Sequence, residues 1–467
     1  MGGQTGSTRA TLRTVAWLSH GRPETLKRSV TSFVSGMGEE ARRYRYVISE
    51  SASAQVKPDY VPSDEFLYVD DEFRTKLISR LETVLKAEGF PEGIARFALD
   101  CSHAEGSEGS HRNVIALLTQ GEPFVCTDDD VIYDLKQLPR FEYRQTRIGQ
   151  HNFLPFSDFA SLEELEKVAA SVSIRDFLRL HETALQTATF SSPGIRGDSA
   201  YGGARFIFTF DDSTLEAFCQ RSDFVREALG SRVMWRETVM SHIVPYAPIA
   251  TYMLGIDGRQ NLAPCFPFHR NVDGAFVYAT KALNPTAQTA QLQASVLHRP
   301  PVDRGQYPSL DSLDFRINDL LWLMWSEWLP SISSNTSPES RIEMASQYFQ
   351  RVGDFDSSQA REYLTDLACR SLLDRAGRLE SQIARLQKKD DVPGLVNWLE
   401  LASKEVELCR EKAHERSLPL PVESDRSGRD DEARLRLTQD WIHSYGWLLA
   451  AWPKMKSTIN EPWREMT

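Results

Sequence analysis

Residues 109–130 read GSHRNVIALLTQGEPFVCTDDD and carry three structural signals in a row. Residues 110–120 form an amphipathic segment, which predicts a helix. The apolar run over residues 123–126 predicts a short buried strand, and three aspartates follow it directly. We therefore expect a helix, a strand and a loop of carboxylates in that order.

Short apolar runs and amphipathic segments alternate in the same way from residue 14 to about residue 131. This alternation predicts a parallel α/β sheet with crossover helices. Ligands of such sheets bind beyond the carboxyl ends of the strands, so we expect the chemistry in the loops at that edge. The expected strands are 14–18, 44–49, about 95–100 and 123–126, and the expected helices are 24–35, about 71–88 and 110–120.

The rest of the chain changes character twice. Residues 132–305 mix helices with short strands, and the glycine-rich stretch 194–203 is expected to be a flexible loop. Helix formers and charges dominate residues 306–467, which predicts a C-terminal all-α region with an exposed linker near 418–431 and a last helix over about 432–451. Residues 1–13 are rich in Gly, Ser and Thr and are expected to be a flexible N-terminus.

Composition limits the classes of function. The 467 residues include 54 Lys and Arg against 65 Asp and Glu, a formal net charge of −11, so binding to a nucleic-acid backbone is excluded as the main activity. The six cysteines show no C-x-x-C pair and no zinc spacing, and they are expected to be reduced. We expect no transmembrane span, because the apolar runs are too short, and no secretion signal, and hence a cytoplasmic protein.

The aspartate triplet carries the strongest chemical signal. Asp128 and Asp130 form a D-x-D pair that can hold a hard divalent cation, Mn²⁺ or Mg²⁺, through carboxylate oxygens. The alternative is that Asp128 or Asp130 caps a short helix over residues 131–138. The triplet by itself leaves both interpretations open.

Residues 109–130 resemble a segment of the inverting, family-two type of glycosyltransferases with the GT-A fold, in which a helix with an Arg-Asn pair precedes a glycine and a strand ending in D-x-D. Residues 15–28 (VAWLSHGRPETLKR) are similar to the first strand, nucleotide-binding loop and first helix of that family. The resemblance implies a GT-A domain over residues 14–305, a Rossmann-like mixed sheet with flanking helices, divided into a nucleotide-binding half (14–131) and an acceptor and sugar half (132–305). The nucleotide-sugar-binding residues that it implies, together with those we add from their positions, are His20, Arg22, Pro23, Glu50, Asp100, Arg112, Asn113, Asp128, Asp129, Asp198 and Arg270.

Residues 266–276 (FPFHRNVDGAF) resemble the family's x-E-D segment, whose last acid is the catalytic base. Val272 replaces the middle Glu, which leaves Asp273 as the base. His298 resembles a C-terminal histidine that completes the metal shell, so the implied metal ligands are Asp128, Asp130 and His298. A structural role for His298 stays open.

The implied chemistry suits these residue types. A divalent cation neutralises the departing nucleoside diphosphate, and a carboxylate takes the proton of the acceptor nucleophile as it attacks the anomeric carbon. We expect a hexosyltransferase with a UDP-sugar donor, inversion at that carbon, and a peptide, protein or glycan acceptor. The C-terminal helices are expected to bind the acceptor or a second copy of the chain.

Two other functions stay open. A sugar nucleotidyltransferase shares the sheet and the metal acids, although Ser19-His20-Gly21-Arg22-Pro23 is a poor triphosphate loop. A non-catalytic scaffold on a glycosyltransferase-like fold is suggested by Val272 and by the helical extension. Gly197-Asp198-Ser199 also resembles a block of a lipase and esterase family, but no Asp-x-x-His partner follows near the C-terminus. Trp322, Trp325 and Trp328 are expected to pack the helical region onto the rest, as are Trp441, Trp447 and Trp452.

Overall fold

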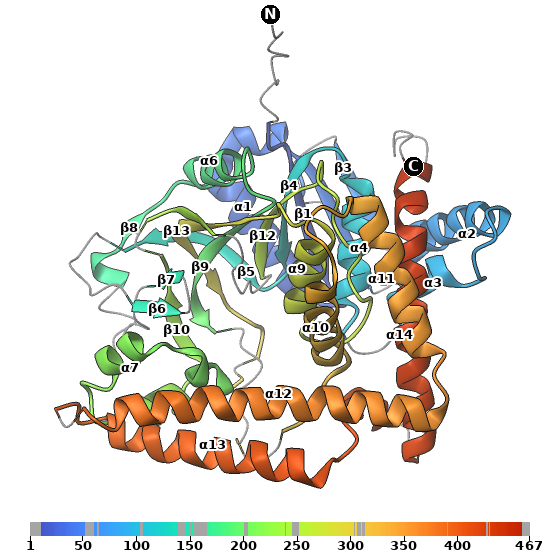
Figure 1. Cartoon of the computed structure of the whole chain (residues 1–467). Helices are drawn as coiled ribbons and strands as arrows, with labels where there is room; N and C mark the ends of the chain where they lie inside the picture. The colour runs from blue at the N-terminus through green and yellow to red at the C-terminus, as the bar shows by residue number, and fades with distance from the viewer. Residues whose placement is uncertain are drawn as a thin grey trace, which may run out of the picture.

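The computed structural model describes residues 11–51, 60–62, 65–102, 106–138, 146–148, 151–153, 166–199, 204–238, 240–244, 252–302, 304–305, 310, 313–389, 391–425, 428 and 430–459. Within these residues, eleven strands form one mixed sheet, helices flank it, and further helices follow in the C-terminal third (Figure 1). The predicted α/β sheet with a C-terminal helical region is therefore confirmed.

The strands of the sheet are β1 (Thr14–Ser19), β2 (Arg45–Glu50), β3 (Phe66–Val69), β4 (Pro123–Asp128), β5 (Val131–Gln137), β8 (Ala170–Ser171), β9 (Phe190–Asp198), β10 (Val233–Arg236), β11 (His242–Val244), β12 (Met253–Asp257) and β13 (Thr289–His298), and a separate pair consists of β6 (Thr146–Ile148) and β7 (His151–Phe153). The helices are α1 (Pro23–Met37), α2 (Asp71–Ala87), α3 (Ile94–Leu99), α4 (Glu108–Leu118), α6 (Ile174–Ala184), α7 (Asp212–Phe218), α8 (Phe224–Gly230), α9 (Val272–Leu283), α10 (Ile317–Trp328), α11 (Pro338–Gly353), α12 (Ser357–Leu386), α13 (Leu395–Glu415) and α14 (Asp431–Thr458). Short 3-10 helices are η1 (Gly38–Arg43), η2 (Ala204–Thr209), η3 (Leu329–Ser331) and η4 (Val422–Asp425).

The N-terminal half of the sheet is parallel, in the order β3-β2-β1-β4. Trp17 of β1 lies opposite Ile48 of β2 and Thr127 of β4, and these strands are almost entirely buried. Strands covered on both faces are typical of parallel α/β sheets. Because the strands are parallel, β1, β2 and β4 all end at one edge, where the acidic turn lies.

One expected strand is wrong. Residues 94–99 (IARFAL) form helix α3 instead of a strand near 95–100. The buried residues Ile94, Ala95, Ala98 and Leu99 recur at helical spacing, and two of them are alanines, which favour helix over strand. Strand β3, which has no counterpart among the predicted strands, pairs with β2 instead.

On its other side β4 pairs with β12, and the sheet continues in the order β12-β9-β13-β5. The neighbours in this part are antiparallel except for β9 and β13, which are parallel. Residues 131–137 alternate between buried and more exposed positions, which is the period of a strand, so the alternative of a short helix over 131–138 is wrong. The expected loop at 194–203 is also wrong over residues 194–198, which belong to β9, while residues 200–203 lie outside the described residues. The glycines of β9 allow close approach: a Cβ at Gly194 would overlap the carbonyl oxygen of Arg236.

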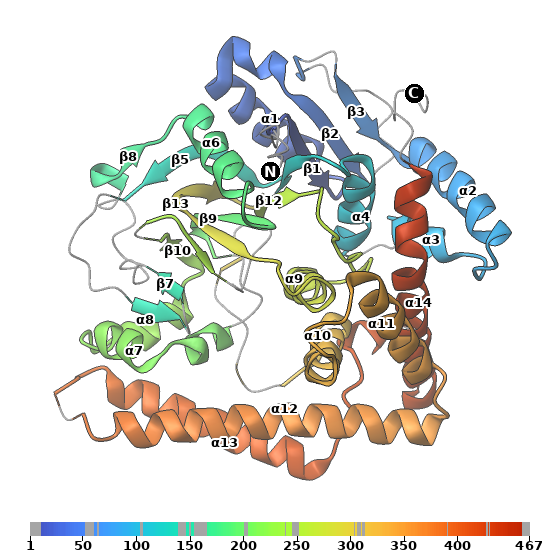
Figure 2. The same ribbon diagram turned by 45° about the horizontal axis from the view of Figure 1, so that its top comes forward.

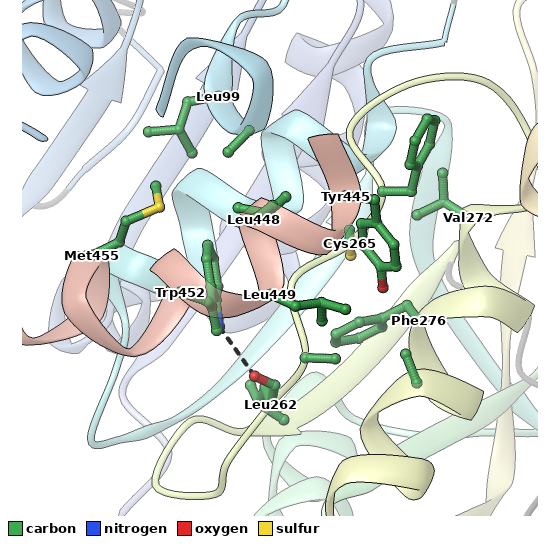
Figure 3. Packing of buried hydrophobic residues seen from close by; sticks show 14 of the residues in the cluster. Leu99, Leu262, Cys265, Val272, Phe276, Tyr445, Leu448, Leu449, Trp452 and Met455 are labelled. Carbon is green, nitrogen blue, oxygen red and sulfur yellow. Dashed lines mark hydrogen bonds between the residues drawn. The ribbon is translucent and has the colours of Figure 1, made fainter. Parts of the chain in front are cut away.

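The C-terminal helices share their core with the sheet. Apolar residues of α10, α11 and α14 form one buried cluster with residues of α3, α4 and α9. Figure 3 shows Trp452, Tyr445 and Leu449 of α14 packed towards Phe276 of α9, and Trp452 Nε1 donates a hydrogen bond to the carbonyl oxygen of Leu262 at 3.1 Å.

Of the tryptophans expected to join the two regions, Trp325 and Trp328 are buried in that cluster with Trp452, and Trp441 and Trp447 pack against it. Trp322 is 42% exposed and lies outside the buried cluster, but its ring meets that of Tyr278 of α9 edge-on at 6.4 Å between centroids. The expected linker near 418–431 includes the packed turn η4, in which Ser424 is buried and the Val422 N–H donates to the Phe315 carbonyl.

Helices α12 and α13 form a long hairpin along one side of the molecule (Figures 1 and 2). Its buried side packs against η2, α7 and α8, and Trp398 Nε1 of α13 donates to the Ile207 carbonyl at 3.4 Å. All six cysteines are buried free thiols. None of the described helices is both long enough and apolar enough to cross a bilayer.

Candidate functional site

The polar site lies where β1, β2 and β4 end. The loop after β1 carries His20 and Arg22, β2 ends at Glu50, and β4 continues into the turn that contains residues 128–130. The Gly21 N–H donates to Glu50 Oε1 at 2.7 Å, and Gly21 itself has a positive φ of 69°. The buried Glu50 carboxylate therefore fixes the shape of the loop after β1.

Asp129 anchors that loop from the other side. Its carboxylate is fully buried and accepts hydrogen bonds at 3.0 Å from Ser19 Oγ and from Arg22 Nε. Arg22 Nη2 also lies 2.5 Å from Asp129 Oδ1, and Arg22 Nη1 lies 3.5 Å from Asp130 Oδ2. Asp129 is therefore held by the loop after β1, whereas Asp128 lies near a side chain of α4 and Asp130 near one of β13.

Asp130 faces the end of β13. Its Oδ1 lies 3.2 Å from His298 Nε2, while His298 Nδ1 hydrogen-bonds to the Asp198 carbonyl at 2.8 Å. Arg304 reaches both acids, at 3.8 Å from Asp130 Oδ2 and 3.5 Å from Asp198 Oδ1. Burial opposes the charged imidazolium of His298, but the hydrogen bond and charge of Asp130 outweigh it and raise the pKa of His298.

Arg112 of α4 connects Asp128 with Asp273. Its Nη1 donates to Asp273 Oδ1 at 2.8 Å, and its Nη2 lies 3.7 Å from Asp128 Oδ1. Burial opposes the charge of the guanidinium, but Asp273 and Asp128 outweigh it and raise the pKa of Arg112. Burial raises the pKa of Asp128, and the charges of Asp130 and Asp273 add to this although Arg112 acts in the opposite direction. A cation close to Asp128 would stabilise its ionised form.

The donor set suits a divalent cation that is shared with a ligand. Asp128 Oδ1 and Asp130 Oδ1 are buried, hard oxygen donors, and each faces a nitrogen of the protein: Arg112 Nη2 lies 3.7 Å from Asp128 Oδ1, and His298 Nε2 lies 3.2 Å from Asp130 Oδ1. Within the described residues, however, no group of three His, Cys, Asp or Glu is arranged to hold a metal ion. The two carboxylates would therefore hold Mn²⁺ or Mg²⁺ with phosphate oxygens and water as the remaining ligands, as is usual for Mg²⁺.

Asp273 reaches the site because the segment before α9 is pressed against the start of α4. The Ser110 N–H donates to the Pro267 carbonyl at 2.8 Å, and the His269 N–H donates to the Gly106 carbonyl at 2.5 Å. A Cβ at Gly106 would collide with the backbone of His269, so only glycine permits this approach.

Helix α10 holds the same segment in a strained conformation. His269 and Asn271 have positive φ angles of 70° and 67°, which is uncommon outside glycine. Asn318 Nδ2 lies 3.2, 3.4 and 3.0 Å from the carbonyl oxygens of residues 268, 269 and 270, and Asp319 Oδ1 accepts from Asn271 Nδ2 at 2.9 Å. The C-terminal helical region thus sets the backbone that leads into Asp273.

Replacing Asn318 by alanine is expected to lower the free energy of unfolding by about 1–3 kcal/mol, because buried carbonyl groups lose their donor. Amide hydrogen exchange over residues 268–274 should accelerate in the same variant. The matched control is Asn397→Ala, which removes one exposed hydrogen bond of 2.9 Å to the Ser222 carbonyl. Equal exchange rates over residues 268–274 in Asn318→Ala and the wild type would contradict this role.

Some expected site residues serve other purposes. The Asn113 amide is buried and exchanges hydrogen bonds with the backbone of Cys265 and donates to the Ala98 carbonyl at 3.1 Å. Asp100 follows α3 and accepts from the Ser102 N–H at 2.9 Å, at one side of a groove of about 680 Å³ that α2 and α3 line. Pro23 is the first residue of α1, where its missing N–H costs nothing.

His20 lies on the opposite side of the loop from the triplet. Its Nδ1 is 3.3 Å from Ser107 Oγ, its Nε2 is 3.9 Å from Glu108, and its ring meets that of the buried His111 edge-on at 5.0 Å between centroids. Burial lowers the pKa of both imidazoles. His20 is therefore a neutral group at the wall of the site.

Two arginines at the site were not predicted from the sequence. Arg304 contacts Asp130 and Asp198, and Arg232 Nε donates to Asp198 Oδ2 at 3.2 Å. Neither arginine stands in a motif: Arg232 precedes β10, and Arg304 lies six residues beyond the end of β13. Their spacing from the aspartate triplet gives no local signal that could have found them.

Comparison of the chain with protein-family models found no match, and comparison with the sequences of curated proteins found none either.

Proposed function

We propose that the chain is a metal-dependent glycosyltransferase of the GT-A type that moves a sugar from a nucleotide sugar to an acceptor nucleophile. The observation that carries the proposal is the contact through Arg112, which brings Asp128 and Asp273 to one guanidinium although Arg112 and Asp273 are 161 residues apart in the chain. Asp130 adds a second buried acid two residues after Asp128, and its Oδ1 faces His298 Nε2 at 3.2 Å.

On the donor side, Asp128 and Asp130 bind the cation that would hold the nucleoside diphosphate. A divalent cation there supplies positive charge to the leaving diphosphate. Arg22 adds a fixed guanidinium next to Asp130, and Arg112 adds one next to Asp128. Donors that are positioned before the reaction stabilise developing negative charge without reorganisation during the step.

On the acceptor side, Asp273 takes the proton. Its side chain is 31% exposed, in contrast to the fully buried Asp129, so an acceptor hydroxyl can reach it. Arg112 Nη1 donates to Asp273 Oδ1 at 2.8 Å and holds the carboxylate in position. One base beside the attacking nucleophile is the requirement of direct displacement, which inverts the anomeric carbon.

The remaining parts of the proposal are a UDP-sugar as donor, a peptide, protein or glycan as acceptor, and a cytoplasmic location. Association of two copies through the C-terminal helices belongs to the same proposal. We infer these points from the resemblance of residues 15–28 and 109–130 and from the composition of the chain.

The test measures nucleotide release from UDP-, GDP-, dTDP- and CMP-sugars by the purified chain, with Mn²⁺ and with EDTA. We expect nucleotide release in the presence of Mn²⁺ and none in the presence of EDTA. The rate of release should fall by about a hundredfold or more in Asp128→Asn, since a bound cation contributes several kcal/mol to the step. Asp212→Asn is the matched control, because Asp212 also pairs with an arginine, Arg385 at 2.6 Å, at a distant surface.

Three outcomes would contradict the proposal. Absence of both turnover and metal-dependent nucleotide binding across all four donors would exclude it. Incorporation of nucleotide into a sugar phosphate from a nucleoside triphosphate would favour a nucleotidyltransferase. Nucleotide binding without transfer to any acceptor or water, unchanged in Asp273→Asn, would favour a scaffold.

A further inference from the structure

Arg304 lies between two buried acids that come from different strands of the sheet. Its Nη2 is 3.8 Å from Asp130 Oδ2, in the turn after β4, and its Nη1 is 3.5 Å from Asp198 Oδ1, at the end of β9. The side chains of the two acids are 4% and 9% exposed, whereas that of Arg304 is 31% exposed. The guanidinium is therefore nearer to solvent than the carboxylates that it joins.

Both contacts of Arg304 are long. A hydrogen bond between a guanidinium and a carboxylate usually measures about 2.7–2.9 Å, so at 3.5 and 3.8 Å the arginine makes no short hydrogen bond to either acid. Among the described residues, no other carboxylate contacts it. A guanidinium carries more N–H groups than two such contacts use, so Arg304 can still donate to a further oxyanion.

The two other arginines of this network are held more closely. Arg22 lies 2.5 and 3.0 Å from the carboxylate oxygens of Asp129. Arg232 Nε donates to Asp198 Oδ2 at 3.2 Å, and its side chain is only 9% exposed. Arg304 is therefore the arginine of the three that gives up the least when it leaves its acids.

Both acids keep a partner when Arg304 leaves. Asp130 retains His298 Nε2, 3.2 Å from its Oδ1, and Arg22 Nη1, 3.5 Å from its Oδ2. Asp198 retains Arg232. Movement of Arg304 therefore leaves no buried carboxylate without a partner, which would be the costly outcome.

We propose that Arg304 is the movable cationic group of the site: it neutralises Asp130 before a divalent cation binds there, and it turns to the diphosphate of the donor once the cation is bound. A cation at Asp130 repels the guanidinium beside the same carboxylate and so weakens its hold on the acid. The diphosphate oxygens then offer the guanidinium a partner of opposite charge. The inference rests on the proposed function for the cation and the diphosphate, and on the measured contacts for the choice of Arg304.

The first experiment measures the affinity for Mn²⁺ alone, from the electron paramagnetic resonance signal of the free ion. We expect Arg304→Gln to bind Mn²⁺ at least about threefold more tightly than the wild type, because it lacks the positive charge that opposes the cation. Arg304→Lys should stay near the wild type. Arg410→Gln is the matched control, since Arg410 is an exposed arginine of α13 that pairs with Glu380 of α12. Thermal unfolding of each variant shows whether it remains folded.

The second experiment measures the affinity for UDP, GDP and dTDP at saturating Mn²⁺. We expect the affinity for the nucleoside diphosphate that binds the wild type best to fall at least about fivefold in Arg304→Gln, and to be partly restored in Arg304→Lys, because the diphosphate loses a charged donor. The two expected shifts have opposite signs. A substitution that merely disturbed the local structure would weaken both kinds of binding.

An affinity for Mn²⁺ that is equal or lower in Arg304→Gln would overturn the inference, and so would an unchanged affinity for the nucleoside diphosphate. Absence of Mn²⁺ binding in both proteins would overturn it as well. Neither measurement needs sugar transfer. Opposite shifts without any transfer would therefore remove the proposed activity and leave the role of Arg304, whereas transfer by the wild type with unchanged affinities in Arg304→Gln would do the reverse.

Discussion

Asp273→Asn is expected to lower the rate of sugar transfer by about a hundred- to ten-thousand-fold, the contribution typical of a general base. The substitution keeps the volume of the side chain, and the amide oxygen can still accept from Arg112 Nη1, which lies 2.8 Å from Asp273 Oδ1. The measurement is single-turnover transfer from the donor identified with the wild type, together with the affinity for the nucleoside diphosphate and Mn²⁺.

The affinity for the nucleotide should stay near that of the wild type, because the proposed function assigns the cation and the diphosphate to Asp128 and Asp130 and assigns only the acceptor to Asp273. Loss of nucleotide binding in Asp273→Asn would mean that this acid holds the donor instead. An unchanged transfer rate would mean that another group takes the proton. Asp212→Asn serves again as the control for replacing an aspartate that pairs with an arginine.

Trp452→Ala is expected to cost about 3–5 kcal/mol in the free energy of unfolding, the range found for removing a large buried aromatic side chain. Trp452 is 3% exposed, and it lies in the cluster that joins α14 to the helices beside the sheet (Figure 3). Trp452→Phe should cost less, because it retains most of the contact and loses chiefly the hydrogen bond to the Leu262 carbonyl.

The number of unfolding transitions adds a second readout to this experiment. Since residues of α14 and of α4 and α9 belong to one cluster, we expect Trp452→Ala to shift the unfolding of the sheet and of the C-terminal helices together. Chemical denaturation followed by circular dichroism and by tryptophan fluorescence should give coincident curves. A transition of the helices alone, with the sheet unaffected, would show that residues 306–467 unfold as a separate unit.

Local patterns in the sequence were sufficient to predict most helices and strands of the N-terminal, parallel part of the sheet. The apolar runs of β1, β2 and β4 and the amphipathic segments of α1, α2 and α4 each contain their own signal, and the structure places them within a few residues of the expected bounds. The short segment 94–99 failed because six residues cannot separate a buried helix from a strand by periodicity. The glycines of β9 indicated a loop, whereas they allow β10 and β13 to approach closely.

The residues of the candidate site also differ in whether a local sequence pattern could indicate them. Asp128, Asp130 and Arg112 could be predicted because they lie in one segment of the chain, and the structure brings Arg22, Asp273 and His298 to them. The contacts of Asp129 with Ser19 and Arg22 join residues 110 and 107 positions apart, and the hold of Asn318 on the segment before α9 joins residues about 50 positions apart. No pattern within a window of sequence reports such contacts.

The hold of α10 on the segment before Asp273 has a consequence for how this protein could change over evolutionary time. Asn318 and Asp319 fix the backbone of residues 268–271, and α14 fills the core beneath α9. The helices therefore cannot be exchanged as an independent module, as an appended specificity cassette could be. Any lineage that lost them would have to rebuild the entrance to α9 before its acid could again face the turn after β4.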